Sequence, residues 1–112
     1  MAKGESLGEF EHLVLLAVLR LRSAAYGMRV RHEIAERTGR DVTIGAVYAT
    51  LERLEAKGLV ASEIGDLTPE RGGRAKRSFH LTGAGVEAVN RVQENLLSML
   101  EGIAFPLPGG GQ

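Results

Sequence analysis

Apolar and polar residues follow two different periods along this chain, and the changes of period divide it into helices and strands. Up to about residue 58, apolar positions recur every three to four residues, the spacing of amphipathic helices. Residues 59–64 and 76–81 show instead the short apolar runs and alternation typical of strands. Helical spacing returns after residue 82. The pattern predicts three helices, two strands and a final helix, in that order.

The first two predicted helices have recognisable ends. Ser6 and Glu9 form a capping box ahead of a helix over residues 7–21, whose apolar residues cover more than one stripe and therefore require burial on two sides. A second helix is expected from residue 24 or 25 to residue 38, with Ser23 as its cap and Gly39 at its end. Its arginines at positions 29, 31 and 37 contact phosphates or pair with neighbouring glutamates; both readings stay open.

Thr43 is expected to cap a third helix, which ends near Gly58 and follows the second helix after a short turn. The two helices form a candidate helix-turn-helix. A major groove admits one helix, small residues permit its close approach, and an arginine can bind a guanine edge or a phosphate. The residues outside the apolar stripe that we expect to face DNA are Thr43, Gly45, Ala46, Thr50 and Arg53.

A basic segment rich in turn formers joins the two predicted strands into a long hairpin. Its four cations, with no acidic residue from 71 to 77, are Arg71, Arg74, Lys76 and Arg77. Such a charge run is commonly only a solvated face. Beside a helix-turn-helix it favours a wing that reaches the minor groove or the flanking phosphates.

Thr82 is expected to cap the last helix, in which apolar residues recur with the alternating gaps of a two-helix seam. We therefore expect a homodimer. Its predicted interface consists of Leu7, Phe10, Val14, Val89, Gln93, Leu96, Leu100 and Ile103. The expected organisation is a winged helix-turn-helix domain over residues 1–82, a dimerisation helix over 83–103 and a flexible tail over 104–112. The fold class is mainly α with a small β-hairpin (α+β).

Composition and charge limit the partners and the cellular location that we expect for this protein. The 14 basic and 14 acidic residues balance, so a nucleic-acid partner has to be argued from local charge placement. The chain has no cysteine, which fits a reducing compartment, and its longest apolar run, residues 13–19, falls short of the ~20 residues that span a bilayer. Acidic residues interrupt any signal peptide. We expect a cytoplasmic protein without a membrane partner.

Two motifs suggest dinucleotide binding and zinc-dependent hydrolysis, but each lacks a residue or element that the function needs. A Gly-x-Gly-x-x-Ala segment begins at Gly83, but no second parallel strand or acidic residue follows to complete a dinucleotide site. The segment from His32 has Glu36 where a zinc hydrolase needs its second histidine. We expect no metal, no cofactor and no enzymatic activity.

Three segments together resemble the PadR family of bacterial transcriptional regulators: Ala25–Gly27, residues 43–54 with 57–60, and residues 72–82 with Gly85. The resemblance implies DNA-binding repressors that dimerise through their terminal helices, some of which release DNA when a small molecule binds. It also implies that Tyr26 and Tyr48 contact the DNA backbone. From the residues alone, both tyrosines equally suit packing at the edge of the core.

The sequence thus predicts a regulator that binds double-stranded DNA as a homodimeric repressor on a palindromic operator. A small-molecule effector of unknown identity belongs to the same expectation. The alternative is a protein-interaction module that uses the same apolar helices and binds no DNA.

Overall fold

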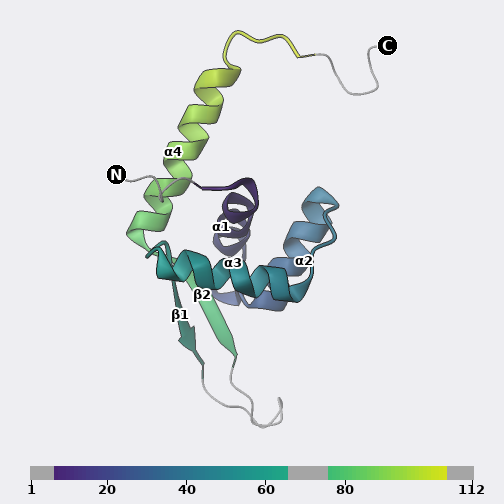
Figure 1. The fold of residues 1–112 in the computed structure, drawn as a ribbon, viewed down its shortest axis with the longest axis vertical. Helices are drawn as coiled ribbons and strands as arrows, with labels where there is room; N and C mark the ends of the chain where they lie inside the picture. Colours follow the sequence, from purple (N-terminus) through teal and green to yellow (C-terminus); the bar gives the residue numbers. More distant parts are fainter. Residues whose placement is uncertain (1–6, 66–75, 106–112) are drawn as a thin grey trace.

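The computed structural model of the protein describes residues 7–65 and 76–105. Within them the chain forms helices and one antiparallel hairpin, in the predicted order (Figure 1). The fold is a winged helix-turn-helix of the α+β class, extended by a C-terminal helix. The elements are α1 (Glu9–Leu21), the 3₁₀ turn η2 (Arg22–Ala24), α2 (Gly27–Thr38), α3 (Ile44–Ala56), β1 (Val60–Ile64), β2 (Arg77–Leu81) and α4 (Gly83–Leu100).

The hydrophobic core lies around α1, which contacts α2, α3, β2 and α4. Leu15 of α1, Leu51 and Leu54 of α3, Val30 of α2 and Phe79 of β2 are among its fully buried side chains. Burying each such side chain stabilises the fold by about 1.5–3 kcal/mol. The shared core therefore holds α3 and the hairpin against α1.

The hairpin is anchored to the segment that precedes α2. Strands β1 and β2 pair from Val60 with Leu81 to Ile64 with Arg77. Beyond this ladder, the N–H of Phe79 donates to the carbonyl of Ala25 at 3.0 Å. The hairpin base and the start of α2 consequently hold one another in position. Residues 66–75, which connect the strands, lie outside the described residues.

The predicted caps of α3 and α4 are confirmed. The Thr43 hydroxyl accepts a hydrogen bond from the Ala46 N–H at 3.0 Å, and the Thr82 hydroxyl accepts one from the Gly85 N–H at 3.1 Å. Gly39, with φ of 75°, ends α2 as expected. Side-chain capping chemistry is local in sequence, which is why it was predictable.

Other boundaries differ from prediction. Helix α1 begins at Glu9, because the Glu11 carboxylate reaches back to accept from the Gly8 N–H at 3.1 Å; Ser6 lies outside the described residues. Helix α2 begins only at Gly27, after the η2 turn, so Ser23 is not its cap. Helix α4 ends at Leu100, because the chain turns at Gly102 with φ of 81°.

Helix α4 packs on the domain only through its first turns. A Cβ at Gly85 would overlap the Leu59 carbonyl, so the helix starts in close contact with the segment after α3. Ala88 and Val89 are buried, whereas the later turns extend away from the domain, opposite to the hairpin (Figure 1). Among the described residues, none of the helices is both long and apolar enough to cross a membrane.

Candidate nucleic-acid interface

The first half of α3 presents a face of small exposed residues. Gly45 and Ala46, both predicted, lie exposed just after the Thr43 cap. Ala49 is exposed one turn later and extends the same face. Ala49 was not predicted to face DNA, although it follows Ala46 by three residues and Gly45 by four and so belongs to the same helix face. The backbone of α3 is thereby open to a close approach by a groove.

Thr50 corrects the prediction that it faces outward. Its side chain lies on the core side of α3 and is only 2% exposed. It lies three residues from Val47 and four from Leu54, on the buried stripe, and its hydroxyl accepts a hydrogen bond from Nη2 of Arg53 at 3.2 Å. Because Thr50 is polar, the apolar pattern of the sequence did not place it on the buried stripe, although tertiary packing buries it.

The two tyrosines pack through their rings. The half-buried Tyr48 ring lies 6.5 Å from that of Phe79 and so close to Gly27 that a Cβ there would overlap it. Tyr26 is half-buried at the N-cap of α2, with Nζ of Lys76 4.4 Å from its ring centroid. Neither hydroxyl forms a hydrogen bond within the described residues. Core packing of the rings and a phosphate contact by the hydroxyls are therefore compatible.

The predicted basic residues of the hairpin divide into two kinds. Lys76 is exposed and forms no ion pair with the described residues. Arg77 instead lies 2.8 Å from a Glu55 oxygen and 3.6 Å from a Glu52 oxygen, and its guanidinium also stacks over the ring of Phe79. Arg77 thus ties β2 to α3. Arg71 and Arg74 lie outside the described residues.

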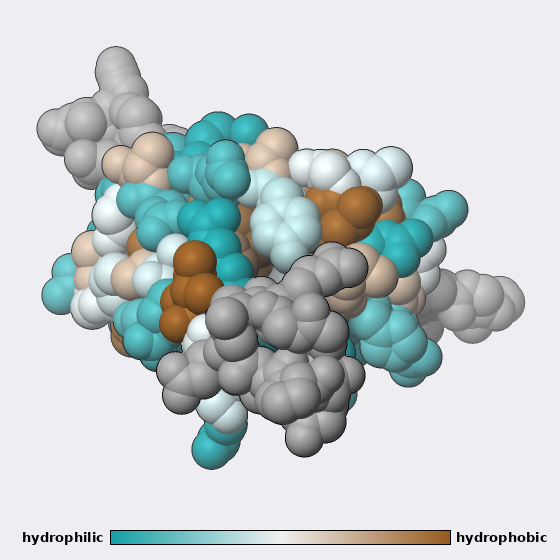
Figure 2. Space-filling view, turned by 90° about the horizontal axis from the view of Figure 1, so that it is seen from below, coloured by the Kyte–Doolittle hydropathy of each residue, from teal (hydrophilic) through white to brown (hydrophobic). Residues whose placement is uncertain are grey.

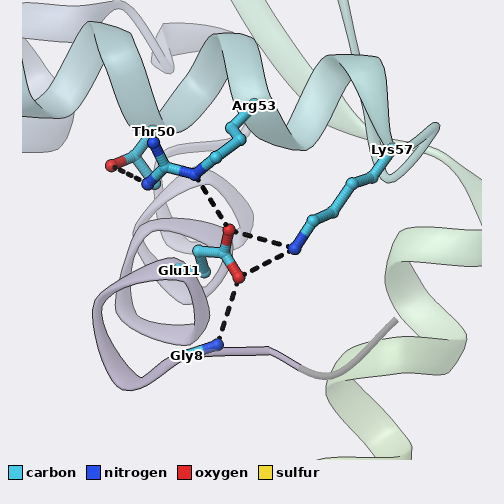
Figure 3. Close-up of polar contacts among 5 residues, drawn as sticks. All are labelled: Gly8, Glu11, Thr50, Arg53 and Lys57. Atoms are coloured by element: carbon cyan, nitrogen blue, oxygen red, sulfur yellow. Dashed lines mark hydrogen bonds and ion pairs between the residues drawn. The ribbon is translucent and has the colours of Figure 1, made fainter. Parts of the chain in front are cut away.

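Arg53 is likewise held within the protein. Its Nε donates to Glu11 of α1 at 3.2 Å, and Lys57 donates to both oxygens of the same carboxylate (Figure 3). Burial by itself raises the pKa of Glu11, but hydrogen bonds from the Gly8 N–H, Lys57 and Arg53 together outweigh burial and lower that pKa below its ordinary value. Glu11 is therefore charged at neutral pH.

The arginines of α2 also differ in their partners. Arg37 donates to Glu33 at 2.8 Å, and Arg31 donates to the Val42 carbonyl at 2.7 Å. Arg29 is exposed and makes no ion pair with the described residues. Hydrogen bonds from Arg37 and Arg20 lower the pKa of Glu33. Of the three arginines, Arg29 is the one whose charge is not already matched by a described carboxylate or carbonyl.

The hairpin end of the molecule is polar. Figure 2 views the molecule from this end, and the described residues there are mostly hydrophilic, with hydrophobic residues in separate small areas. No group of three or more histidines and carboxylates within residues 7–65 and 76–105 is arranged to hold a metal ion. Among the described basic residues of the hairpin, Lys76 is the exposed cation without an ion pair to another described residue.

The predicted dimer residues also need correction. Val14 is fully buried and Val89 is buried, both in the core of their own chain, so neither side chain is left to contact a partner. Leu7 and Phe10 are half-buried against that core. The remaining predicted residues, all exposed, are Gln93, Leu96, Leu100 and Ile103. Ile103 lies beyond the end of α4.

Further exposed apolar residues near the end of α4 were not predicted as part of the dimer interface. Leu97 and Phe105 are exposed, and Met99 is 75% exposed. Together with Leu96 and Leu100, Leu97 and Met99 form an apolar band on one side of the last turns of α4 that is wider than a single seam. A hydrophobic surface of this extent is typical of an interaction site.

A helix-turn-helix with small residues on its second helix, a basic hairpin beside it and a C-terminal helix defines the winged helix-turn-helix class of DNA-binding transcriptional regulators. Residues 15–91 match the model of the PadR-like family of transcriptional regulators. The chain belongs to this family, and it is a DNA-binding regulator and not an enzyme. No curated protein sequence matches the chain.

Several solved structures share the fold, and one that is 26% identical is a PadR family regulator. A PadR family regulator from Eggerthella lenta is 26% identical, with a TM-score of 0.65 over 84% of this chain and 81% of that chain. RosR from H. salinarum is 28% identical, with a TM-score of 0.67 over 91% of this chain and 84% of that chain. A PadR family regulator from Clostridium difficile shares the fold at 22% identity, with a TM-score of 0.67 over 80% and 90% of the two chains.

Proposed function

We propose that this PadR family regulator is a homodimeric repressor that acts in the cytoplasm on a palindromic operator. The observation that carries the proposal is the pairing of two surfaces on one small domain. The open face of α3 suits a major groove, and the exposed apolar end of α4 suits a second copy of the chain. The apolar end of α4 extends away from the domain that contains α3 (Figure 1), so a two-fold dimer through α4 leaves both α3 helices free.

In the proposed complex, Gly45, Ala46 and Ala49 allow α3 to enter the major groove. The free N–H groups at the start of α3 and the Thr43 cap suit a phosphate, because a helix N-terminus carries partial positive charge. The hydroxyl groups of Tyr26 and Tyr48 and the ammonium of Lys76 contact the backbone beside it. In a two-fold dimer the two α3 helices read half-sites about 34 Å apart.

Arg53 supplies the base or phosphate contact at the later turns of α3. Thr50 is too deeply buried to contact DNA. Arg77 stabilises the hairpin through its ion pair with Glu55 of α3. Arg71 and Arg74, outside the described residues, remain proposed wing contacts. The wing adds affinity that depends little on sequence, because phosphate contacts carry no base information.

The experiment is selection from a random pool of duplex DNA with the wild-type protein, followed by anisotropy titrations with the enriched sequence. The proposal predicts a two-fold symmetric consensus. A protein-interaction module without DNA binding predicts no enrichment and no anisotropy change, even at low salt, where phosphate contacts are strongest.

An effector is the remaining part of the proposal. An open cavity of about 620 Å³ lies where α1, β2 and α4 meet, and the apolar side chains at its wall include Leu19, Phe79 and Val86. A small molecule bound there contacts both α4 and the hairpin base, so it is able to alter their relative position. A screen that measures release of labelled operator from the protein tests this part. A compound that binds the cavity should release the operator, and a compound that does not bind the protein should leave it bound.

A further inference from the structure

One carboxylate of α1 lies between a cation of α3 and the cation that follows its end. Glu11 is 8% exposed, and its Oε2 accepts from Nε of Arg53 at 3.2 Å, while Nζ of Lys57 donates to both of its oxygens at 3.1 Å. The Gly8 N–H donates to Oε1 at 3.1 Å and fixes the carboxylate at the start of α1 (Figure 3). Four hydrogen bonds thus hold Glu11 in one orientation.

The same contacts fix the plane of the Arg53 guanidinium. Its Nε is held by Glu11 and its Nη2 by the buried hydroxyl of Thr50, which belongs to the preceding turn of α3. Nη1 forms no hydrogen bond within the described residues, and the side chain is 55% exposed. A planar group with two of its three nitrogens held presents its remaining N–H groups in a set direction. Arg53 is therefore oriented before it meets any ligand.

This arrangement differs from an ordinary surface ion pair. Exposed ion pairs contribute little to stability, because both side chains lose conformational freedom and gain only a weak attraction in water. Here the carboxylate is already buried and immobile, so Arg53 loses its freedom during folding and not on binding. An oriented donor binds more tightly and discriminates better than a mobile one, because less entropy is lost on association.

We propose that Glu11 is a positioning residue for operator recognition, which acts by holding the Arg53 guanidinium in the orientation in which it contacts DNA. The inference rests on the proposed function, in which Arg53 on α3 meets the operator. Glu11 itself does not touch DNA. Because Glu11 belongs to α1, the inference also links the position of α1 to the orientation of a DNA-contacting side chain on α3.

The test compares binding of the selected operator and of a scrambled duplex by the full chain and its variants, measured by anisotropy. Glu11→Gln keeps the shape but removes the charge. We expect it to lower operator affinity roughly tenfold and to leave or raise affinity for scrambled DNA, so the specificity ratio falls roughly tenfold. In an Arg53→Ala background, Glu11→Gln should have no further effect on that ratio.

Glu33→Gln is the matched control, because Glu33 also bridges two arginines, Arg20 and Arg37, but lies away from α3. It should leave the ratio unchanged. Thr50→Val removes the second anchor of Arg53 without touching Glu11, and it should reproduce the loss of specificity. It also serves as the test if Glu11→Gln does not fold.

Two results would overturn the inference alone: a specificity ratio unchanged in Glu11→Gln and Thr50→Val, or an equal loss with and without Arg53. In either case Arg53→Ala would still impair operator binding. Unchanged operator binding by Arg53→Ala would overturn the assignment of Arg53 in the proposed function, and the positioning role with it.

Discussion

The ring of Tyr48 on α3 rests directly on the backbone of Gly27 at the start of α2. A side chain at position 27 would occupy the space of that ring, so the glycine sets the distance between the two helices of the helix-turn-helix. The proposed phosphate contact of Tyr48 depends on this close packing.

Gly27→Ala should destabilise the fold, since an added methyl in a packed site forces side chains or backbone to shift, typically at about 1–3 kcal/mol. Chemical denaturation of the variant measures the loss. Gly45→Ala is the matched control, because no atom lies closer than 3.9 Å to a Cβ at Gly45. In that exposed helical position alanine should raise stability by about 0.5–1 kcal/mol. Equal effects of the two changes would contradict the packing account.

Lys76 and Arg77 are adjacent cations with different expected roles. Lys76→Ala should weaken binding of all DNA sequences alike and reduce the slope of log affinity against log salt by about one unit. Arg77→Ala should change that slope less and lower the melting temperature, because Glu55 and Glu52 lose their partner. Salt titrations and thermal melts of both variants decide between the roles. A larger slope change for Arg77→Ala would make Arg77 the DNA contact.

The Glu11 network predicts a pH dependence of stability. The folded-state pKa of Glu11 lies below its ordinary value of 4.5, so its charged form stabilises the fold fully above that value. The contribution is lost as pH falls through the lowered folded-state pKa. Wild type should therefore exceed Glu11→Gln in unfolding free energy at neutral pH, and the difference should shrink below about pH 4.5.

Denaturation of both proteins between pH 7 and 3 measures this difference. Taking the difference removes the effect of His12, whose pKa burial lowers, because both proteins retain it. A difference that stays constant across this range would show that the Glu11 carboxylate gains nothing from its partners.

The dimer proposal predicts that Leu96→Glu with Leu100→Glu produces a monomer. Both side chains are exposed on α4, and two buried carboxylates in a symmetric interface would oppose association. Ser98→Glu is the control, because residue 98 lies across the helix from both leucines. Light scattering on each variant gives the molar mass. A dimer in the double variant would remove α4 from the interface.

The elements and caps were predictable because their signals are local. Thr43 and Thr82 precede helical periodicity directly, and Gly39 follows it. The end of α4 was missed because seam spacing continued past Gly102, whose positive φ turns the chain.

The site was predictable in part. The small face of α3 follows from helical spacing, but the partners of Arg53 and Arg77 come from residues 42 and 22 positions away in the sequence. Only folding brings Glu11 and Glu55 beside these arginines. Similarly, Val14 looked available for a partner because α1 is apolar on two sides, whereas its own core buries it.

The molar mass of the protein–operator complex, measured by light scattering, tests the central claim most directly. We expect two protomers on one palindromic operator for the wild-type protein, and loss of that complex for Leu96→Glu with Leu100→Glu at the same concentration. A wild-type complex that contains a single protomer, or an intact two-protomer complex of the double variant, would contradict it.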